Sequence, residues 1–217
     1  MYNESAVITD TVRQLSTAFG RIVCVDDGSQ DDTGLLASRA GATVVHHPVN
    51  LGQGAALQTG VDYALGSSAR YFLTFDADGQ HRIEDALAMV ERLREGDVDI
   101  VLGSRFLGTE LQVPSLRKFI LRVAVLFTRM TTGLALTDTH NGLRVMNRST
   151  AVLFKIRLSG MAHASEILDV VARHNLSYEE MPISVVYSQY SLAKGQSSLN
   201  AVNVLVDIVL ARLRVKR

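Results

Sequence analysis

The chain has 217 residues, 47% of them hydrophobic and 20% charged, a composition that can bury a full core and excludes a disordered protein. Its 22 basic and 22 acidic side chains give zero formal charge, which argues against a protein that coats nucleic acid by bulk charge. The balance conceals a split, because residues 1–110 carry 8 basic and 16 acidic side chains and residues 111–217 carry 14 and 6. An acidic half joined to a basic half indicates a site that holds a cation on one side and anions on the other.

Cysteine content and hydropathy exclude further classes. Cys24 is the only cysteine and lies in an apolar run, which excludes a disulfide framework and a Cys-based zinc site. No stretch approaches the roughly 18 consecutive apolar residues of a membrane span, and the first four residues begin no signal peptide. We therefore expect a protein that is soluble or peripheral to a membrane.

The first hundred residues alternate between helix and strand. The expected helices cover residues 8–19, 54–65 and 83–93, with a short one after residue 31, and the expected strands cover 22–26, 42–45, 71–75 and 98–102. This alternation predicts an α/β fold with a mostly parallel sheet covered by helices on both faces. Ligands bind such sheets at the carboxyl ends of strands, where Asp26, Asp76 and Arg105 fall.

The second half of the chain is basic. A helix is expected over residues 115–131, with Lys118, Arg122 and Arg129 on one face. Further expected elements are a strand at 143–146, a helix at 162–175, an extended segment at 178–187 and a helix at 199–213. We divide the chain into a catalytic domain over 1–198, with a nucleotide and metal half at 1–110 and an acceptor half at 111–198, and a C-terminal amphipathic helix with a basic tail over 199–217.

An acidic turn follows the expected strand at 71–75. Asp76 and Asp78 are separated by one residue, and Gln80 lies in the same turn. Oxygen ligands at this spacing chelate hard divalent ions such as Mg²⁺ or Mn²⁺, which in turn hold phosphates. An isolated motif of this kind is a simple helix-capping turn about half the time. Its position at the end of a buried strand favours the metal site.

A second acidic turn, Val25-Asp26-Asp27-Gly28-Ser29, follows the first expected strand. Its carboxylates are suited to accept hydrogen bonds from a nucleobase N–H or from ribose hydroxyls. Alone, the turn is equally typical of ordinary helix caps. The histidines have no zinc-site spacing, so we interpret His46-His47 as structural and expect His81 to orient the metal turn.

Five motifs occur in one order along the chain: Tyr2-Asn3-Glu4, Val25–Ser29, Asn50–Gly54, Asp76–His81 and Gly103-Ser104-Arg105. In this order they resemble the family 2 glycosyltransferases, and they are most similar to the branch of dolichyl- and polyprenyl-phosphate sugar synthases. The resemblance implies the three-layer GT-A fold of nucleotide-diphospho-sugar transferases. It covers residues 2 to about 200 and does not specify the individual substrate.

The resemblance also implies the roles of individual residues. The implied nucleotide-sugar site consists of Tyr2, Glu4, Asp27, Gly54, Asp76 and Asp78, and the implied Mn²⁺ or Mg²⁺ site of Asp76, Asp78 and Gln80. The implied catalytic residues are Asp78, Arg105, Arg117 and Arg144. The implied acceptor site consists of Arg105, Arg117, Asp138, Asn141, Glu166, Lys194 and Ser197.

The sequence departs from the family pattern in four places. In the segment ending at Arg144, Asn141 replaces the usual serine and Leu143 the usual phenylalanine, and Leu192 stands where a late arginine is usual. Family members also begin with a strand that runs into the Tyr-Asn-Glu turn, whereas Met1 directly precedes Tyr2 here. Loss of this central strand would expose unpaired backbone on its neighbours, so we expect the native chain to start upstream of Met1.

The resemblance predicts an inverting, metal-dependent transfer of a sugar from a nucleotide diphosphate sugar to a lipid phosphate. The helix at 115–131 and the basic tail would rest on the anionic cytoplasmic face of a membrane, although a solvated basic face is the simpler alternative. A transferase acting on a saccharide hydroxyl remains open and would need a base, for which Asp138 and Glu166 are the candidates. A third alternative is a non-catalytic scaffold that binds an integral-membrane partner. A nucleotidyltransferase is disfavoured because residues 1–20 contain no glycine-rich phosphate loop.

Overall fold

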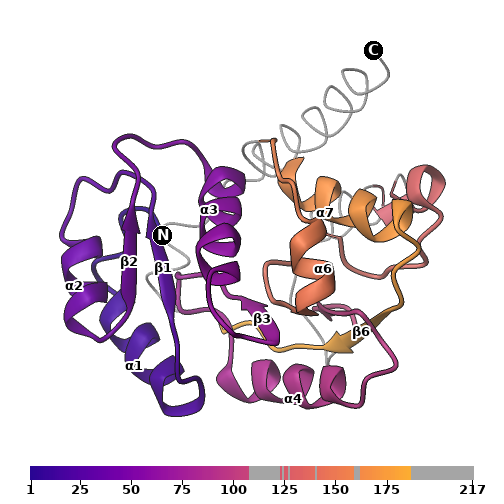
Figure 1. Ribbon diagram of the computed structural model, residues 1–217, viewed down its shortest axis with the longest axis horizontal. Coiled ribbons are helices and arrows are strands. Elements are labelled where there is room, and N and C mark those ends of the chain that lie inside the picture. The colour runs from indigo at the N-terminus through magenta and orange to yellow at the C-terminus, as the bar shows by residue number, and fades with distance from the viewer. Residues whose placement is uncertain (108–122, 124, 127, 140, 159–161, 187–217) are drawn as a thin grey trace.

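The computed structural model describes residues 1–107, 123, 125–126, 128–139, 141–158 and 162–186 (Figure 1). Its elements are α1 (Ile8–Ala18), β1 (Val23–Asp26), α2 (Thr33–Arg39), β2 (Thr43–His46), α3 (Gln53–Leu65), β3 (Tyr71–Thr74), α4 (Ile83–Arg94), β4 (Ile100–Ser104), β5 (Arg144–Asn147), α6 (Arg148–Leu153), α7 (Ala162–Arg173) and β6 (Tyr178–Pro182). Most of the helix expected at 115–131 and all of 199–217 lie outside the described residues.

The strands form two sheets. β1 and β2 pair in parallel, and a four-stranded sheet has the order β3-β5-β4-β6. In the larger sheet β4 and β6 are parallel, whereas β5 runs antiparallel to both of its neighbours. β3, β4 and β6 therefore share one direction, so the expected mostly parallel arrangement has β5 as its exception.

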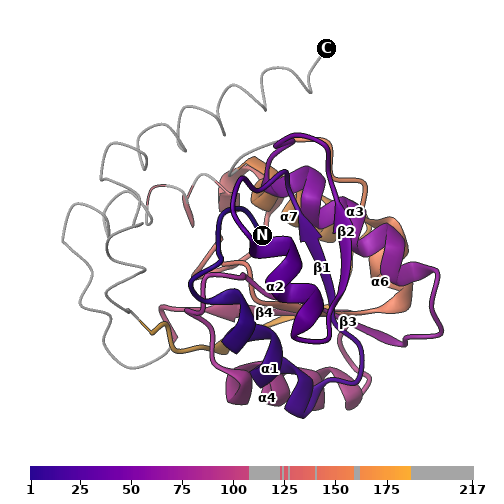
Figure 2. The same cartoon turned by 90° about the vertical axis from the view of Figure 1, so that its left-hand side faces the viewer.

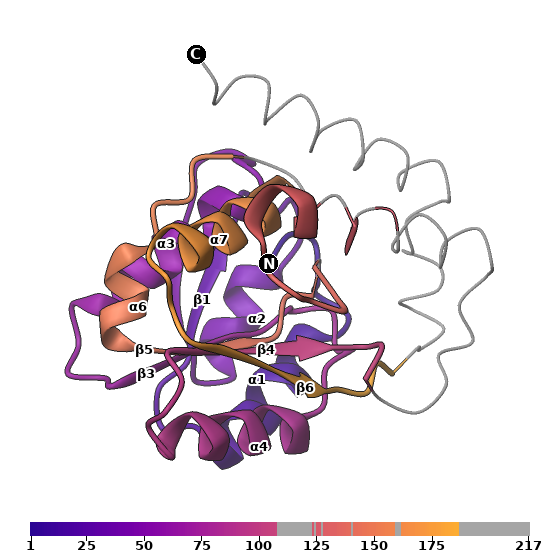
Figure 3. The same cartoon turned by 90° about the vertical axis from the view of Figure 1, so that its right-hand side faces the viewer.

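Helices cover both faces of the four-stranded sheet, as Figure 3 shows with α4 on one side and α3, α6 and α7 on the other. The alternation of side chains along each strand explains this layering, because successive residues point to opposite faces. Ile100 and Leu102 pack in the cluster formed with α3, α6 and α7, whereas Val101 packs in the cluster formed with α4. The predicted three-layer α/β fold is confirmed.

The smaller sheet forms a unit with α1 and α2 (Figure 2). Ile8 and Val12 are buried on the same face of α1 because they are four residues apart, and they pack with Ala37 and Ala42. α3 contacts both β1 and β3 and so connects this unit to the larger sheet.

Met1 lies beside β1. Its amino group donates to the carbonyl of Val25 at 2.8 Å, and the N–H of Asp27 donates to the Met1 carbonyl at 2.9 Å. This is the bonding pattern of one residue of a parallel neighbouring strand. In the described residues β1 and β3 share no ladder. Met1 thus occupies the end of the position that the resemblance assigns to the family's first strand.

The sequence does not predict the short helix α6. Asn147 sets the start of this helix, because its side chain accepts from the Thr150 N–H at 2.8 Å.

The described part of the chain contains no helix with the length and apolarity that a bilayer crossing requires.

Candidate active site

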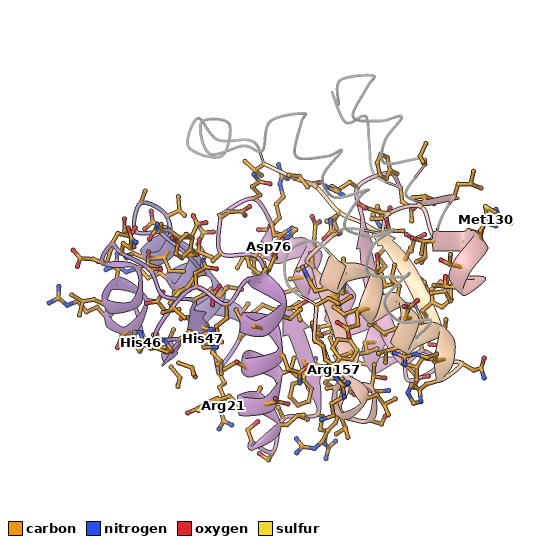
Figure 4. All side chains as sticks on the ribbon, turned by 90° about the horizontal axis from the view of Figure 1, so that it is seen from above. Arg21, His46, His47, Asp76, Met130 and Arg157 are labelled. Carbon is orange, nitrogen blue, oxygen red and sulfur yellow. The ribbon has the colours of Figure 1, made fainter. Side chains whose placement is uncertain are left out.

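Three predicted site residues lie directly after strands. Asp27 follows β1, Asp76 lies just after β3 and Arg105 follows β4. In Figure 4 Asp76 lies centrally, between the part of the chain that carries His46 and His47 and the part that carries Arg157. Parallel β-sheets collect such residues at one edge because the carboxyl ends of the strands meet there.

Asp76 is held by two nitrogen groups. Its Oδ2 lies 3.1 Å from His81 Nε2, and its Oδ1 accepts from Gln53 Nε2 at 3.3 Å. Burial acts to raise the pKa of Asp76, but the His81 hydrogen bond and the charges of Arg144 and His163 outweigh burial and keep the pKa below its ordinary value. Asp76 is therefore ionised at neutral pH. His81 orients this turn, as the sequence predicts.

Gly142 lies directly against the Asp76 carboxylate. A Cβ at this position would overlap the carboxylate carbon and both oxygens. Thr74 reinforces the approach, because its hydroxyl donates to the Gly142 carbonyl at 2.6 Å. The segment that leads into β5 can approach Asp76 this closely only with glycine at position 142.

Asp78 completes the acidic turn. Burial and the neighbouring charge of Asp76 raise its pKa, and its Oδ1 accepts from the Gln80 N–H at 3.0 Å. Gly79 provides the turn with a positive φ of 74°. Two mutually repelling carboxylates fit a divalent cation, and the Gln80 side chain would supply a third oxygen. No group of three or more His, Cys, Asp or Glu side chains gathers around a common metal position in the ranges that the structure describes.

The segment from Tyr2 to Ser5 docks on the loop after β1. The Asn3 N–H donates to Ser29 Oγ at 3.0 Å, and the Glu4 N–H donates to Thr33 Oγ1 at 2.7 Å. Asn3 has a positive φ of 53°, which turns the backbone toward this loop. Tyr2 and Glu4 are thereby brought to the same loop as Asp27, as the predicted nucleoside site requires.

Arg105 and Asp138 form a two-point ion pair on the other side of the site. Arg105 Nε donates to Asp138 Oδ2 at 2.7 Å, and Nη2 donates to Oδ1 at 2.9 Å. Glu180 supports the pair from β6, because its carboxylate accepts from the backbone N–H groups of Thr137 and Asp138. Burial and the charge of Asp138 raise the pKa of Glu180, although its hydrogen bonds oppose this rise.

Arg144 begins β5, opposite Thr74 of β3 and Leu102 of β4. Its side chain is buried, and the charges of Asp76 and Asp138 both act on it. Burial lowers the pKa of Arg144 to about 10, so the guanidinium still carries its charge at neutral pH. Its Nη1 is a buried nitrogen with no hydrogen-bond partner among the described residues. Arg144 therefore interacts electrostatically with both Asp76 and Asp138.

Other predicted site residues shape the backbone. Asn141 Oδ1 accepts from the Leu143 N–H at 2.7 Å, and Glu166 Oε2 accepts from the N–H groups of Arg157 and Leu158. Gly54 approaches the Leu158 carbonyl so closely that no Cβ would fit. Arg117, Lys194 and Ser197 lie outside the described residues.

Sequence reasoning missed two residues that the structure brings to the site. Glu180 accepts from the Asp138 N–H, and His47, which the sequence indicates as structural, lies beside Asp27. The available signals were a carboxylate within a predicted extended segment and a histidine pair directly after a strand. These signals are weak because the partner of each residue is distant in sequence.

Comparison with known proteins identifies the class. The family model described as Glycosyl transferase family 2 matches residues 1–151, so the chain belongs to this family. It is a glycosyltransferase with the GT-A fold, as the sequence motifs predict.

The chain is similar to several individual proteins. An undecaprenyl-phosphate mannosyltransferase of Micrococcus luteus is 30% identical, over 89% of this chain and 84% of its own. A UDP-N-acetylglucosamine–dolichyl-phosphate N-acetylglucosaminyltransferase of Methanococcus voltae is 26% identical, over 98% of this chain and 93% of its own. The structure of glucosyl-3-phosphoglycerate synthase from Mycobacterium tuberculosis with phosphoglyceric acid aligns with a TM-score of 0.74 and 19% identity, over 96% of this chain and 76% of that one.

Proposed function

We propose that this protein transfers a sugar from a nucleotide diphosphate sugar to a polyprenyl-type lipid phosphate, with inversion at the anomeric carbon and with Mn²⁺ or Mg²⁺. The observation that carries the proposal is the place of Arg144 on β5, opposite Thr74 of β3, which leads to Asp76, and opposite Leu102 of β4, which leads to Arg105 and its pair with Asp138. The acidic turn proposed for the metal and donor thus adjoins the two arginines proposed for the acceptor side, Arg105 and Arg144. Relatives named for dolichyl-phosphate and undecaprenyl-phosphate substrates support the acceptor class.

The reaction requires one substitution at carbon. A phosphate oxygen of the acceptor attacks the anomeric carbon opposite the leaving group, and the bond from that carbon to the diphosphate oxygen breaks with its electron pair going to the diphosphate. A bound divalent ion would supply Lewis-acid stabilisation of the leaving diphosphate. Asp76, Asp78 and Gln80 would hold this ion, and Arg105 would add positive charge on the acceptor side.

The carboxylates favour a phosphate acceptor over a hydroxyl acceptor. A lipid phosphate is already ionised at neutral pH, whereas a saccharide hydroxyl needs a general base. Asp138 is committed to the ion pair with Arg105, and Glu166 to two backbone N–H groups. Both carboxylates predicted as bases thus make contacts that hold neighbouring segments in place.

The acceptor class suggests a location. We assign the protein to the cytoplasmic face of a membrane, with the basic residues of 111–217 attracted to anionic lipid. Residues 115–131 and 199–217 are the proposed contact segments. An integral-membrane partner is a further proposed contact of this surface.

A donor and acceptor panel tests the proposal. The full chain is incubated with UDP- and GDP-sugars, Mn²⁺ and polyprenyl phosphate, with a saccharide acceptor in parallel. We expect glycolipid product that disappears with EDTA and with Asp78→Ala. Product on the saccharide alone would favour the hydroxyl acceptor. Metal-dependent nucleotide binding without product, unchanged by Asp78→Ala, would favour a non-catalytic scaffold.

A further inference from the structure

His46 and His47 are consecutive residues in different environments. His46 is the last residue of β2 and His47 follows it. His46 pairs with Asp26, and His47 pairs with the next residue, Asp27. The side chain of His46 is 62% exposed and lies 3.3 Å from Asp26, whereas that of His47 is only 8% exposed (Figure 4). A buried imidazole needs a partner for each ring nitrogen, so the contacts of His47 are informative.

Both ring nitrogens of His47 are engaged. Nδ1 lies 2.7 Å from Asp27 Oδ1, and Nε2 lies 2.9 Å from the Thr59 hydroxyl on α3. Asp27 is ionised, because the hydrogen bonds from His47, Leu51 and Gly52 outweigh burial and lower its pKa. An ionised carboxylate only accepts, so Nδ1–H donates to Asp27, and the hydroxyl of Thr59 is the partner of Nε2.

These contacts leave Asp27 little free capacity. Oδ1 accepts from His47 and from the Leu51 N–H at 2.9 Å, and Oδ2 accepts from the Gly52 N–H at 2.8 Å. A carboxylate has about four acceptor positions, so one position on Oδ2 is left for a ligand. One acceptor at a fixed angle matches a base edge that presents a single N–H beside carbonyl oxygens.

We propose that His47 is a positioning residue for nucleobase selection. Together with Thr59, it fixes the rotation of the Asp27 carboxylate, so that Oδ2 faces the N–H of the donor's base. This inference rests on the proposed function, because it requires that the loop after β1 receives a nucleoside. It gives His47, which the sequence alone indicates as structural, a role in nucleotide selectivity.

Isothermal titration calorimetry on the full chain with Mn²⁺ tests this role. UDP, GDP, CDP and ADP are titrated in parallel, with inorganic pyrophosphate as a probe that lacks a base. We expect His47→Ala to weaken the preferred nucleotide about tenfold, the effect of losing roughly 1.4 kcal/mol. We also expect His47→Ala to reduce the ratio of the affinities for preferred and disfavoured nucleotides, while the affinity for pyrophosphate stays unchanged. A purely structural role would change all five affinities together.

Conservative variants locate the effect. His47→Asn places an amide near the position of Nδ1 and should keep the selectivity, whereas His47→Gln reaches toward Thr59 and should lose it. Thr59→Val should give a smaller loss. His46→Ala is the matched control and should keep the wild-type ratios. The Asn and Gln comparison decides the matter if His47→Ala does not fold.

The outcomes separate the two proposals. A wild-type chain that binds no nucleoside diphosphate contradicts the proposed function itself. A wild-type chain that binds nucleotides without preference overturns only the inference about His47, as do equal selectivity ratios for the Asn and Gln variants.

Discussion

Arg105 and Asp138 form an ion pair with two contacts, at 2.7 Å from Nε to Oδ2 and at 2.9 Å from Nη2 to Oδ1. The Asp138 side chain is 1% exposed, so protein groups such as Arg105, and not water, must stabilise its negative charge. This geometry uses the planar fork of arginine, which a lysine cannot reproduce.

We predict that Arg105→Ala lowers the free energy of unfolding by about 3 kcal/mol, because it removes the principal partner of a buried charge. Arg105→Lys should lie between wild type and alanine. Urea denaturation measures both effects. The control is Arg94→Ala, whose exposed pair with Glu91 should be worth about 0–1 kcal/mol. The prediction is wrong if Arg105→Ala costs no more than this control.

We predict that Gly142→Ala abolishes metal-dependent nucleotide binding, because the new Cβ displaces the Asp76 carboxylate. Calorimetric titration with UDP and GDP in the presence of Mn²⁺ measures the loss. Gly20→Ala is the matched control, since a Cβ at Gly20 meets no atom within 4 Å. Unchanged nucleotide affinity in Gly142→Ala would show that Asp76 does not need its present position.

Glu180 should make stability depend on pH. Its pKa is raised above the ordinary 4.5, so the folded chain binds this proton more tightly than the unfolded chain. The tighter proton binding of folded Glu180 therefore stabilises the fold fully below pH 4.5. This stabilisation is lost as the pH rises through the pKa of Glu180 in the folded protein. We therefore predict that the free energy of unfolding of Glu180→Gln, relative to wild type, rises between pH 4 and pH 7. Urea denaturation across this range measures both free energies of unfolding. A difference between them that does not change with pH would contradict the prediction.

Glu166 offers a test of base catalysis. Its carboxylate accepts from the backbone of Arg157 and Leu158, and a glutamine oxygen can accept the same bonds. We predict that Glu166→Gln keeps most of the transfer activity and that Glu166→Ala loses more, because only alanine releases the loop. A general base would instead lose about 10²–10⁴-fold in kcat with either substitution. Initial rates of glycolipid formation distinguish the two cases.

The sequence predicts the local structure well. The strands ending near Asp26 and Asp76 and the helices at 8–19 and 83–93 agree with the structure within one or two residues. Hydrophobic periodicity and turn residues act over a few positions, so a short stretch of sequence is enough to predict each element. The Asp76–Gln80 motif is local in the same way, because its residues lie within one turn. The exceptions are α6, which has only six residues, and the reversed direction of β5.

The class of protein and the residues of its acidic turns follow from the sequence alone, because motifs and periodicity are local. Which side chains meet in space follows from the packing of the strands and helices. Arg105 reaches Asp138 across 33 positions, and Glu180 reaches Asp138 across 42. The close approach of Gly142 to Asp76 likewise follows from the pairing of β5 with β3. Strand order sets such contacts through burial and hydrogen bonding summed over the whole core, and no short stretch of sequence carries that sum.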